Sequence, residues 1–218
     1  MGCRPQPREK DVPRYLRRCQ SSSWPLHAGE SLMSLFVTSD QHWGHKNIIL
    51  YCRRPFKTVE EMNETMIINW NKVVGESDTI LHLGDFALTS QQHLRNIRDR
   101  LNGDIILIPG NHDHASRLRN YDIFVLDSLF SEGVTINMGE LIFTHRPLLN
   151  IPGCMVNVHG HIHDKASYGK YLNVCVDVTN YTPLSIKEVK KRAKDILNGK
   201  RWTIKVIITF IFSEKNIP

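Results

Sequence analysis

The sequence predicts an α/β fold, and two observations support this prediction. In the first half, short apolar segments that indicate buried strands, residues 34–39, 79–83 and 105–108, alternate with amphipathic helical segments. In the second half, short strand-like segments follow one another with turns between them. Because strands that alternate with helices usually pair in parallel, we expect parallel strands in the first half.

Helices of the first half are predicted by their starting residues and their apolar spacing. Residues 58–61 (TVEE) match a capping box, in which two side chains close the open end of a helix. The helix that follows carries apolar residues at three- and four-residue spacing, namely Val59, Met62, Met66, Trp70 and Val73. We interpret this apolar face as core packing rather than as a cofactor site. Residues 90–101 predict a second amphipathic helix.

The second half predicts strands at residues 124–126, 134–138, 141–144, 155–158 and 172–176. Residues 137–140 (NMGE) indicate a hairpin turn between two of these strands. Residues 185–188 (SIKE) form a second capping box, which begins a basic helix that runs to about Asn198 and ends at Gly199. Residues 202–212 predict a final strand.

At 218 residues the chain is long enough to bury the core of one globular domain. We expect this domain at residues 33–198, after a disordered basic extension at residues 1–32 and before a strand or tail at residues 199–218. The net charge of +6 belongs to the ends, because residues 33–184 carry thirteen Lys and Arg against sixteen Asp and Glu. Solvated tails and a solvated helix face are therefore favoured over a nucleic-acid surface.

Cysteine usage and hydropathy predict a cytoplasmic protein. The five cysteines are odd in number, scattered and never spaced as C-x-x-C, which argues against a disulfide framework and a zinc ribbon. No apolar stretch approaches the roughly 20 residues of a membrane helix. No apolar segment follows the N-terminal arginines, so we expect neither a secretory signal nor a membrane partner.

Five short motifs carry the chemistry, and each follows a strand-like segment. They are residues 40–42 (DQH), 84–85 (GD), 110–113 (GNHD), His145 and residues 160–163 (GHIH). Residues at strand ends point into the crevice beyond a sheet, where ligands of α/β proteins bind. An ordinary turn or cap explains any one of these motifs equally well. All five in this order are far more specific.

The residue types in the motifs fit a pair of divalent cations, which needs one bridging carboxylate and further ligands on either side. Asp85 is the expected bridge, because the glycine before it lets the backbone turn sharply off its strand. Asp40 and His42 alternate along an extended segment and can reach the same ion. The full set of predicted metal ligands is Asp40, His42, Asp85, Asn111, His145, His161 and His163.

This arrangement resembles the calcineurin-like metallophosphoesterases over about residues 35–189. Residues 39–49 (SDQHWGHKNII) and 51–56 (YCRRPF) further resemble small bacterial and phage-type members. The resemblance implies a four-layer α-β-β-α sandwich with two mixed sheets. It implies that one metal is held by Asp40, His42, Asp85 and His163, and the other by Asp85, Asn111, His145 and His161. It also implies a catalytic His112 beside the scissile phosphate, with Asp113 orienting it.

The expected charge of the site suits a phosphate substrate. Two divalent ions, two aspartates and a bridging hydroxide sum to about +1, and metal binding lowers the pKa of water from 15.7 to roughly 7. Hydroxide is then available to attack phosphorus at neutral pH, and a protonated His112 could donate to the leaving group. The mixed ligands favour Mn²⁺, Fe²⁺, Zn²⁺ or Ni²⁺ over Mg²⁺ alone, and the resemblance favours Mn²⁺ for activation in vitro.

Several residues are candidates for contacts with the substrate. We expect Asn111, His45 and Arg146 to contact it, and Arg146 could grip a phosphate oxygen. Arg53 and Arg54 could do the same from the first loop. For the arginines a solvated surface position is the favoured alternative, and for His45 a structural role is equally well supported.

We expect a dinuclear metal-dependent phosphoesterase that hydrolyses phosphodiester or phosphomonoester bonds, with a small nucleotide-type molecule as substrate. The short loops between the motifs leave little material to dock a protein substrate or to form a nuclease cap. Residues 86–88 (FAL) lack the acidic or asparagine side chains of some relatives, which leaves the substrate open. Two alternatives remain: a single-strand nuclease, and a non-catalytic scaffold that binds metal or phosphate and presents its basic ends to RNA or a partner.

Overall fold

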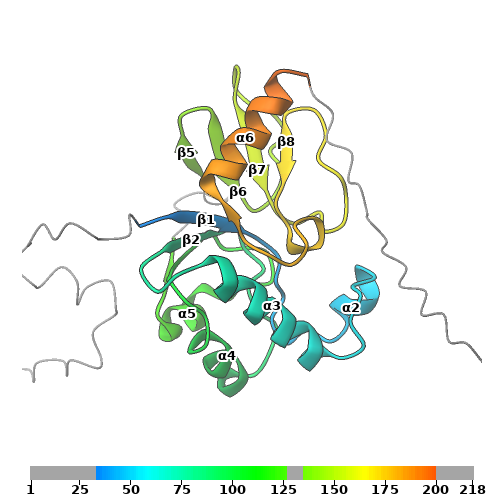
Figure 1. The fold of residues 1–218 in the computed structure, drawn as a ribbon, viewed down its shortest axis with the longest axis vertical. Coiled ribbons are helices and arrows are strands. Elements are labelled where there is room, and N and C mark those ends of the chain that lie inside the picture. The colour runs from blue at the N-terminus through cyan, green and yellow to red at the C-terminus, as the bar shows by residue number, and fades with distance from the viewer. Residues whose placement is uncertain (1–32, 127–134, 200–218) are drawn as a thin grey trace, which may run out of the picture.

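Short apolar segments pair into the first of two β-sheets in the computed structural model, which describes residues 33–126 and 135–199 (Figure 1). Its strands are β1 (Leu35–Thr38), β2 (Thr79–His82), β3 (Asp104–Leu107), β4 (Ile123–Val125) and β9 (Leu184–Ser185). They lie in the order β4-β3-β2-β1-β9. Neighbours from β1 to β4 are parallel, and β9 is antiparallel to β1. The predicted parallel pairing of the first half is confirmed.

The second sheet contains β5 (Ile136–Met138), β6 (Leu141–Thr144), β7 (Val156–His159) and β8 (Tyr171–Asn173), in that order. β5 and β6 form an antiparallel hairpin, while β7 is parallel to both β6 and β8. Gly139 lies in the hairpin turn with a left-handed φ of 61°, which glycine adopts at no steric cost. The predicted hairpin is therefore confirmed, and both sheets of this α/β fold are mixed.

The α-helices of the described ranges are α2 (Ile48–Tyr51), α3 (Val59–Val73), α4 (Gln91–Arg98), α5 (Ala115–Leu118) and α6 (Ile186–Leu197). The two predicted capping residues close α3 and α6. The Thr58 hydroxyl accepts a hydrogen bond from the Glu61 backbone N–H at 3.1 Å. The Ser185 hydroxyl accepts one from Glu188 at 3.2 Å. Such caps typically contribute about 1 kcal/mol each.

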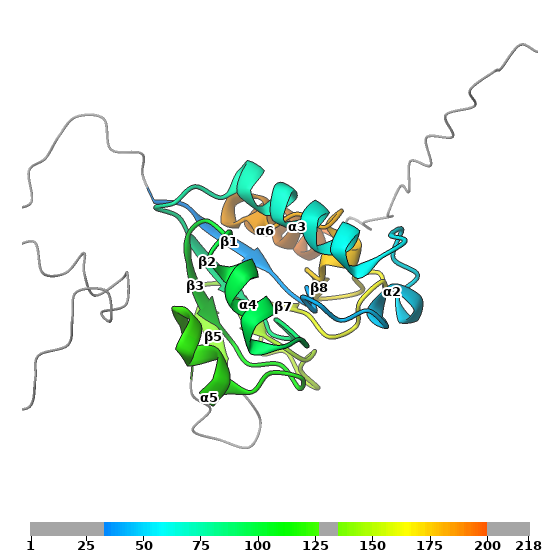
Figure 2. The ribbon, with the colours of Figure 1, turned by 90° about the horizontal axis from the view of Figure 1, so that it is seen from below.

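Two hydrophobic clusters lie on opposite faces of the first sheet. Side chains alternate along β1, so Phe36 joins one cluster and Val37 the other. The first cluster packs α3 and α4 against the sheet, and Figure 2 shows these helices lying across β1 to β3. The second cluster fills the space between the two sheets, where Leu81 and Leu83 meet Phe143. The sheets are thereby held together at their inner faces.

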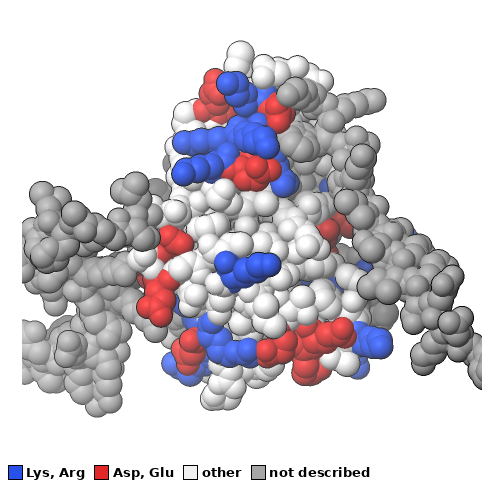
Figure 3. All heavy atoms as spheres, viewed as in Figure 1, with Lys and Arg blue, Asp and Glu red and all other residues white. Residues whose placement is uncertain are grey.

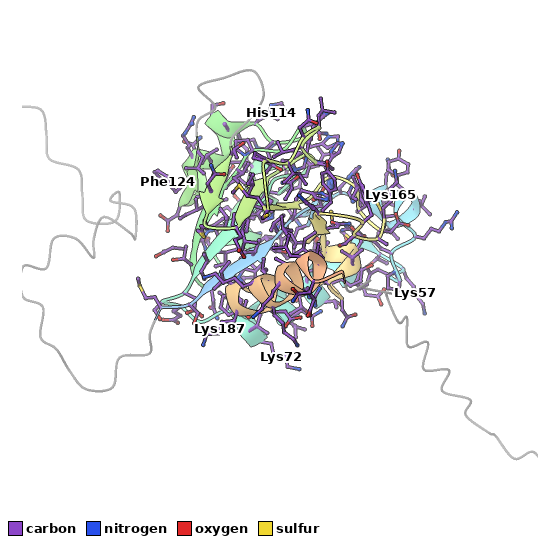
Figure 4. The ribbon with its side chains drawn as sticks, turned by 90° about the horizontal axis from the view of Figure 1, so that it is seen from above. Lys57, Lys72, His114, Phe124, Lys165 and Lys187 are labelled. Atoms are coloured by element: carbon purple, nitrogen blue, oxygen red, sulfur yellow. The ribbon has the colours of Figure 1, made fainter. Side chains whose placement is uncertain are left out.

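Helix α6 has one apolar and one charged face. Val189 and Ala193 are buried in the cluster between the sheets. The exposed lysines are Lys187, Lys190, Lys191 and Lys194, which Figure 3 shows as a blue group over this helix. Figure 4 labels Lys187 on the outside of the helix start. This division is typical of an amphipathic surface helix and agrees with the predicted solvated face.

The structure differs from the sequence prediction at several short elements. The strand expected at residues 172–176 ends at Asn173, and Val176–Val178 forms a 3-10 turn instead. The elements α2, α5 and β9 are two to four residues long, too short to leave a periodic pattern. The predictions for residues 1–32 and 202–212 lie outside the described residues. No helix in the described part of the chain is long and apolar enough to cross a membrane.

The buried face of α3 gives a stability prediction. Met66 is 2% exposed within the first cluster, whereas Ile68 on the same helix is 63% exposed. Met66→Ala should lower the free energy of unfolding by about 2–5 kcal/mol, because it leaves a cavity. Ile68→Ala, the control, should change it by less than about 0.5 kcal/mol. Urea unfolding followed by circular dichroism measures both values, and equal losses would contradict this assignment of the helix faces.

Candidate metal centre

The five motifs follow the carboxyl ends of five strands. The 40–42 motif follows β1, the 84–85 motif follows β2 and the 110–113 motif follows β3. In the second sheet, His145 follows β6 and the 160–163 motif follows β7. Because the strands within each of these two groups are parallel, their carboxyl ends meet at one edge of each sheet. The predicted placement of the motifs at strand ends is confirmed.

Left-handed backbone angles are concentrated in these motifs. Five of the seven predicted ligands have a positive φ, namely Asp40 (62°), His42 (52°), Asp85 (54°), His161 (70°) and His163 (50°). Such a conformation costs a residue other than glycine on the order of 1–3 kcal/mol, and it persists only where the surrounding structure enforces it. Strain gathered in one set of polar side chains is a physical sign of a functional site.

One group of ligand atoms gathers around Asp40. The Oδ1 atom of Asp40 lies 4.0 Å from His42 Nε2 and 3.9 Å from His163 Nε2. Asp40 Oδ1 and both ring nitrogens of His42 are buried and have no hydrogen-bond partner in the protein. A buried polar atom without a partner is costly, and a cation shared by Asp40 Oδ1 and His42 Nε2 would remove that cost at both atoms, with His163 Nε2 within reach. Their ligand atoms lie within 4.8 Å of one another.

Asp85 connects this group to a second one. Its Oδ2 atom lies 3.5 Å from His42 Nε2 and 3.6 Å from His145 Nε2. Its Oδ1 atom accepts a hydrogen bond from the backbone N–H of His112 at 2.9 Å, which fixes the orientation of the carboxylate. One oxygen of Asp85 thus faces imidazoles from both sides, as the predicted bridging role requires.

The second group contains His145, Asn111 and His161. His145 Nδ1 lies 2.7 Å from the Leu83 carbonyl, to which it can only donate, so in the neutral ring the lone pair is on Nε2. That lone pair faces Asn111 Oδ1 at 3.0 Å. Two acceptors at this distance are suited to a shared cation. The ring of His161 lies 5.1 Å from the ring of His145, and Asp85, His145 and His161 form a second set of converging ligand atoms.

Glycines allow the two sheets to approach at the centre. A Cβ atom on Gly84, which has a φ of +96°, would lie 2.6 Å from both Gly110 N and His145 Nδ1. A Cβ atom on Gly160 would overlap Ser39 Oγ and Asp40 Oδ2. Both glycines are therefore required by the close packing of the ligands rather than by a turn alone.

Ser39 and Cys175 hold the second oxygen of Asp40. Asp40 Oδ2 accepts hydrogen bonds from the His161 backbone N–H at 2.9 Å, from the Cys175 thiol at 3.2 Å and from the Ser39 hydroxyl. These three donors leave the Oδ1 atom directed at the imidazoles. Sequence reasoning did not assign this role, because Ser39 directly precedes the 40–42 motif and Cys175 lies outside all five motifs.

The two predicted catalytic residues have different surroundings. His112 is exposed, and its ring lies 5.4 Å from that of His42, one of the predicted ligands. Asp113 accepts hydrogen bonds from the backbone N–H groups of Asp85, Phe86 and Gly110 at 2.7–2.9 Å. These contacts correct the predicted role of Asp113, because its carboxylate holds two backbone loops together instead of orienting the His112 ring.

The predicted substrate contacts also separate into distinct environments. His45 is half-buried with its ring 5.5 Å from that of His42, Asn111 is an exposed member of the second ligand group, and Arg146 is exposed next to His145 in the chain. Arg54 is 4% exposed and paired with Asp177, so neither the suggested phosphate contact nor a surface position holds for it. His114, labelled in Figure 4, is exposed at the edge of the molecule.

Burial and hydrogen bonding set the protonation of the ligands. Burial, followed by the charges of His163 and Arg54, lowers the pKa of His42 to about 2. Burial also lowers the pKa of His161, with His145 and Arg146 acting in the same direction. Burial alone would lower the pKa of His163, but hydrogen bonds with Asp177 and Cys52 raise it to about 10. His42 and His161 thus present neutral lone pairs, whereas a cation must displace a proton from His163.

Comparisons with known proteins give relatives without assigned activities. No family model matches the chain. The chain is 35% identical over 173 residues to "Uncharacterized protein MJ1445" of Methanocaldococcus jannaschii, and the match covers 74% of this chain and 92% of that protein. It is 41% identical over 86 residues to "Gene 66 protein" of Mycobacterium phage L5, which covers 38% of this chain and 41% of that protein.

A solved structure resembles the fold. The crystal structure of the protein of unknown function AQ665 from Aquifex aeolicus superposes on this chain with a TM-score of 0.58 at 24% sequence identity. The match covers 74% of this chain and 100% of the AQ665 chain. At this identity the likeness bears on the fold alone.

The contact at Gly160 gives a binding prediction. Gly160→Ala should lower the affinity for Mn²⁺ or Zn²⁺ at least tenfold, because the added methyl group displaces Asp40, whose oxygen must face the imidazoles. Gly75→Ala is the matched control, since its Cβ would meet only Asp78 at an ordinary 3.4 Å. Isothermal titration calorimetry compares the two variants with the original chain. Unchanged affinity in Gly160→Ala would contradict the proposed convergence.

Buried neutral histidines give a pH prediction. Burial, followed by the charge of His145, lowers the pKa of His82 to about 3, and its ring hydrogen-bonds Gln41 and the Gly84 backbone. The unfolded chain protonates His82 near pH 6.5. The contribution of His82 to stability is therefore constant above pH 6.5 and decreases below it, by about 1.4 kcal/mol per pH unit.

Urea unfolding with a chelator between pH 7 and pH 5 measures this slope. Because this range includes the pKa of the unfolded chain, His82→Gln should flatten the mean slope by about 1 kcal/mol per pH unit, whereas His114→Gln, which changes an exposed histidine, should leave it unchanged. A slope in His82→Gln equal to that of the original chain would show that His82 is not kept neutral by burial.

Proposed function

We propose that this chain, which belongs to the same family as protein MJ1445 of Methanocaldococcus jannaschii, is a dinuclear metal-dependent phosphoesterase. The observation that carries the proposal is the pair of ligand groups on either side of Asp85 Oδ2. His42 and His145 approach this oxygen at 3.5 and 3.6 Å from opposite groups, and buried atoms beside it lack protein donors. Oxygen and nitrogen atoms that lack hydrogen-bond partners in this arrangement are the ligand atoms that a pair of transition-metal ions requires.

The residues present fit two ions with four ligands each. Asp40, His42 and His163 would hold one ion, Asn111, His145 and His161 would hold the other, and Asp85 would contact both. The mixture of imidazole and carboxylate suits Mn²⁺, Fe²⁺, Zn²⁺ or Ni²⁺. When bound, the two ions would neutralise phosphate charge and make hydroxide available near neutral pH.

The fold is consistent with the proposal. Two mixed sheets packed face to face, with α3 and α4 on one outer face, agree with three layers of a metallophosphatase-like α-β-β-α sandwich. In this chain α6 buries Val189 and Ala193 in the cluster between the sheets, so its contacts differ from those of a separate fourth layer. We propose membership of the calcineurin-like superfamily on the combination of sheets and ligand set.

The chain's own residues supply the contacts to a phosphate ester. His112 is exposed beside His42, where its ring could donate a proton to the leaving oxygen. Arg146 is exposed next to His145 and could bind a phosphate oxygen through its fork of N–H donors. We propose a phosphodiester or phosphomonoester of a small nucleotide as substrate. The described cysteines Cys52, Cys154 and Cys175 are unpaired, which supports the proposed cytoplasmic location.

Hydrolysis of bis-p-nitrophenyl phosphate and p-nitrophenyl phosphate with each of the four metals tests the proposal. His112→Asn should lower kcat by roughly 10²–10⁴-fold while two ions remain bound, because it removes the proton donor but no ligand. Asp85→Asn should lose both activity and bound metal. His114→Asn is the matched control, since it changes an exposed histidine two residues away and should retain full activity.

The alternatives make different predictions in the same assays. A chain that binds two ions but hydrolyses neither ester with any metal would favour the non-catalytic scaffold. Cleavage of single-stranded DNA or RNA in preference to cyclic nucleotides and dinucleotides would favour the nuclease. Full kcat in His112→Asn would remove this residue from the proposed chemistry.

A further inference from the structure

Arg54 is a buried arginine whose contacts have no place in the proposed chemistry. Its Nη1 group donates to the Gln41 carbonyl at 2.9 Å and to the Met62 sulfur at 3.4 Å. Its Nη2 group donates to the Asp40 carbonyl at 2.7 Å and to Asp177 Oδ2 at 3.0 Å. Its Nε group donates to Asp177 Oδ1 at 2.8 Å. All five N–H donors therefore have acceptors, so Arg54 has none left for a phosphate oxygen.

The partner of Arg54 connects it to a metal ligand. The side chain of Asp177 is only 2% exposed, and its Oδ2 atom also lies 3.3 Å from His163 Nδ1. An ionised carboxylate can only accept, so His163 must carry its proton on Nδ1 in this contact. Its Nε2 atom, which lies 3.9 Å from Asp40 Oδ1, is then the one that releases its proton and presents a lone pair when a cation binds. Asp177 thus selects the tautomer of His163 that suits a metal ligand.

Arg54 also fixes the other ligands of the same group. Arg54 donates to the carbonyl oxygens of Asp40 and Gln41, and so holds the two peptide groups that connect Asp40 to His42. Asp40 and His42 both have left-handed φ angles, so this backbone needs such support. None of the hydrogen bonds described for Arg54 and Asp177 reaches Asn111, His145 or His161.

We propose that the Arg54–Asp177 ion pair is a positioning unit that sets the affinity of one metal position, the one around Asp40, His42 and His163. This inference rests on the proposed two-metal function. Partners that orient metal-ligating histidines typically contribute 10- to 100-fold to metal affinity. Because the unit contacts one ligand group only, its loss acts on one ion and leaves the other in place.

The same residues do not form a third metal site. Cys52, His163 and Asp177 have ligand atoms within 4.8 Å of one another. Both oxygens of Asp177, however, already accept from the Arg54 guanidinium. A cation there would lie against this fixed positive charge, so the ion pair excludes it.

Asp177→Asn tests the proposal, with Asp122→Asn as the matched control. Asparagine has nearly the shape of aspartate but no charge, and its amide can donate toward His163 Nδ1 and so favour the wrong tautomer. Asp122 pairs at 3.9 Å with Arg98, another buried arginine, whose N–H groups donate to the Leu101 and Gly103 carbonyls far from the metal ligands. The control therefore removes the charge of another aspartate that pairs with a buried arginine, although its side chain is 30% exposed, without touching the candidate centre.

Calorimetric titration of the full chain with Mn²⁺ measures the affinity of each position. We expect one affinity of Asp177→Asn to fall roughly 10- to 100-fold and the other to stay within about twofold, while Asp122→Asn keeps both. At a Mn²⁺ concentration that fills two positions in the original chain, Asp177→Asn should show the electron paramagnetic resonance spectrum of a single ion instead of a coupled pair. Circular dichroism checks that each variant is folded.

Two results would overturn the inference. Asp177→Asn that retains both affinities would show that the ion pair positions no ligand. Equal loss of both affinities would show a general loss of structure instead of selective positioning. The titration of the original chain tests the proposed function separately. If the original chain binds fewer than two Mn²⁺ ions, the proposed two-metal function is wrong, and this inference is wrong with it.

Discussion

The left-handed backbone at the ends of β1, β2 and β7 is the constraint on which the rest of the site depends. If the chain stayed extended after these strands, the polar side chains would lie beyond the strand ends and apart. The left-handed residues turn the backbone, so that Asp40, Asp85 and His163 lie close together. Each turn is unfavourable by itself. The protein holds them with backbone hydrogen bonds from Asp40 N to Gly84 O and from His42 N to Asp85 O, at 3.0 and 3.1 Å. Local strain is therefore offset by contacts between strands.

This geometry has an electrostatic consequence. It brings two buried carboxylates and several imidazole rings together. The hydrogen bonds from the protein reach Asp40 Oδ2 and Asp85 Oδ1, and not the oxygens that face the imidazoles. Acceptors that face one another repel, and burial raises the cost. A cation is the partner that relieves this repulsion, so metal binding and folding are coupled in such a site. The fold and the proposed chemistry then have the same origin.

The sequence predicts the parts of this site that depend on local patterns. Apolar segments of four to six residues locate the strands, and the polar motif that follows within a few residues of a strand end locates the ligands. Capping boxes at Thr58 and Ser185 begin their helices as predicted. The α/β class and the positions of the ligand motifs therefore follow from periodicity and order along the chain.

Contacts between distant segments could not be predicted in this way. Arg53 and Arg54 are neighbours of the same type, yet Arg54 alone is buried, because its partner Asp177 lies 123 residues away. Asp113 lies in a ligand motif, but its carboxylate oxygens accept hydrogen bonds from the backbone N–H groups of the two residues that follow the glycine after β2, Asp85 and Phe86. Nothing in the local sequence distinguishes these buried polar residues from exposed ones. Their roles depend on the three-dimensional approach of the two sheets.

Anomalous diffraction from crystals grown with Mn²⁺ is the most direct measurement of the central claim. Two anomalous peaks are expected, one on each side of Asp85 Oδ2. The first should also lie near Asp40, His42 and His163, and the second near Asn111, His145 and His161. Absence of anomalous density at Asp85, or a single peak that avoids these side chains, would contradict the central claim.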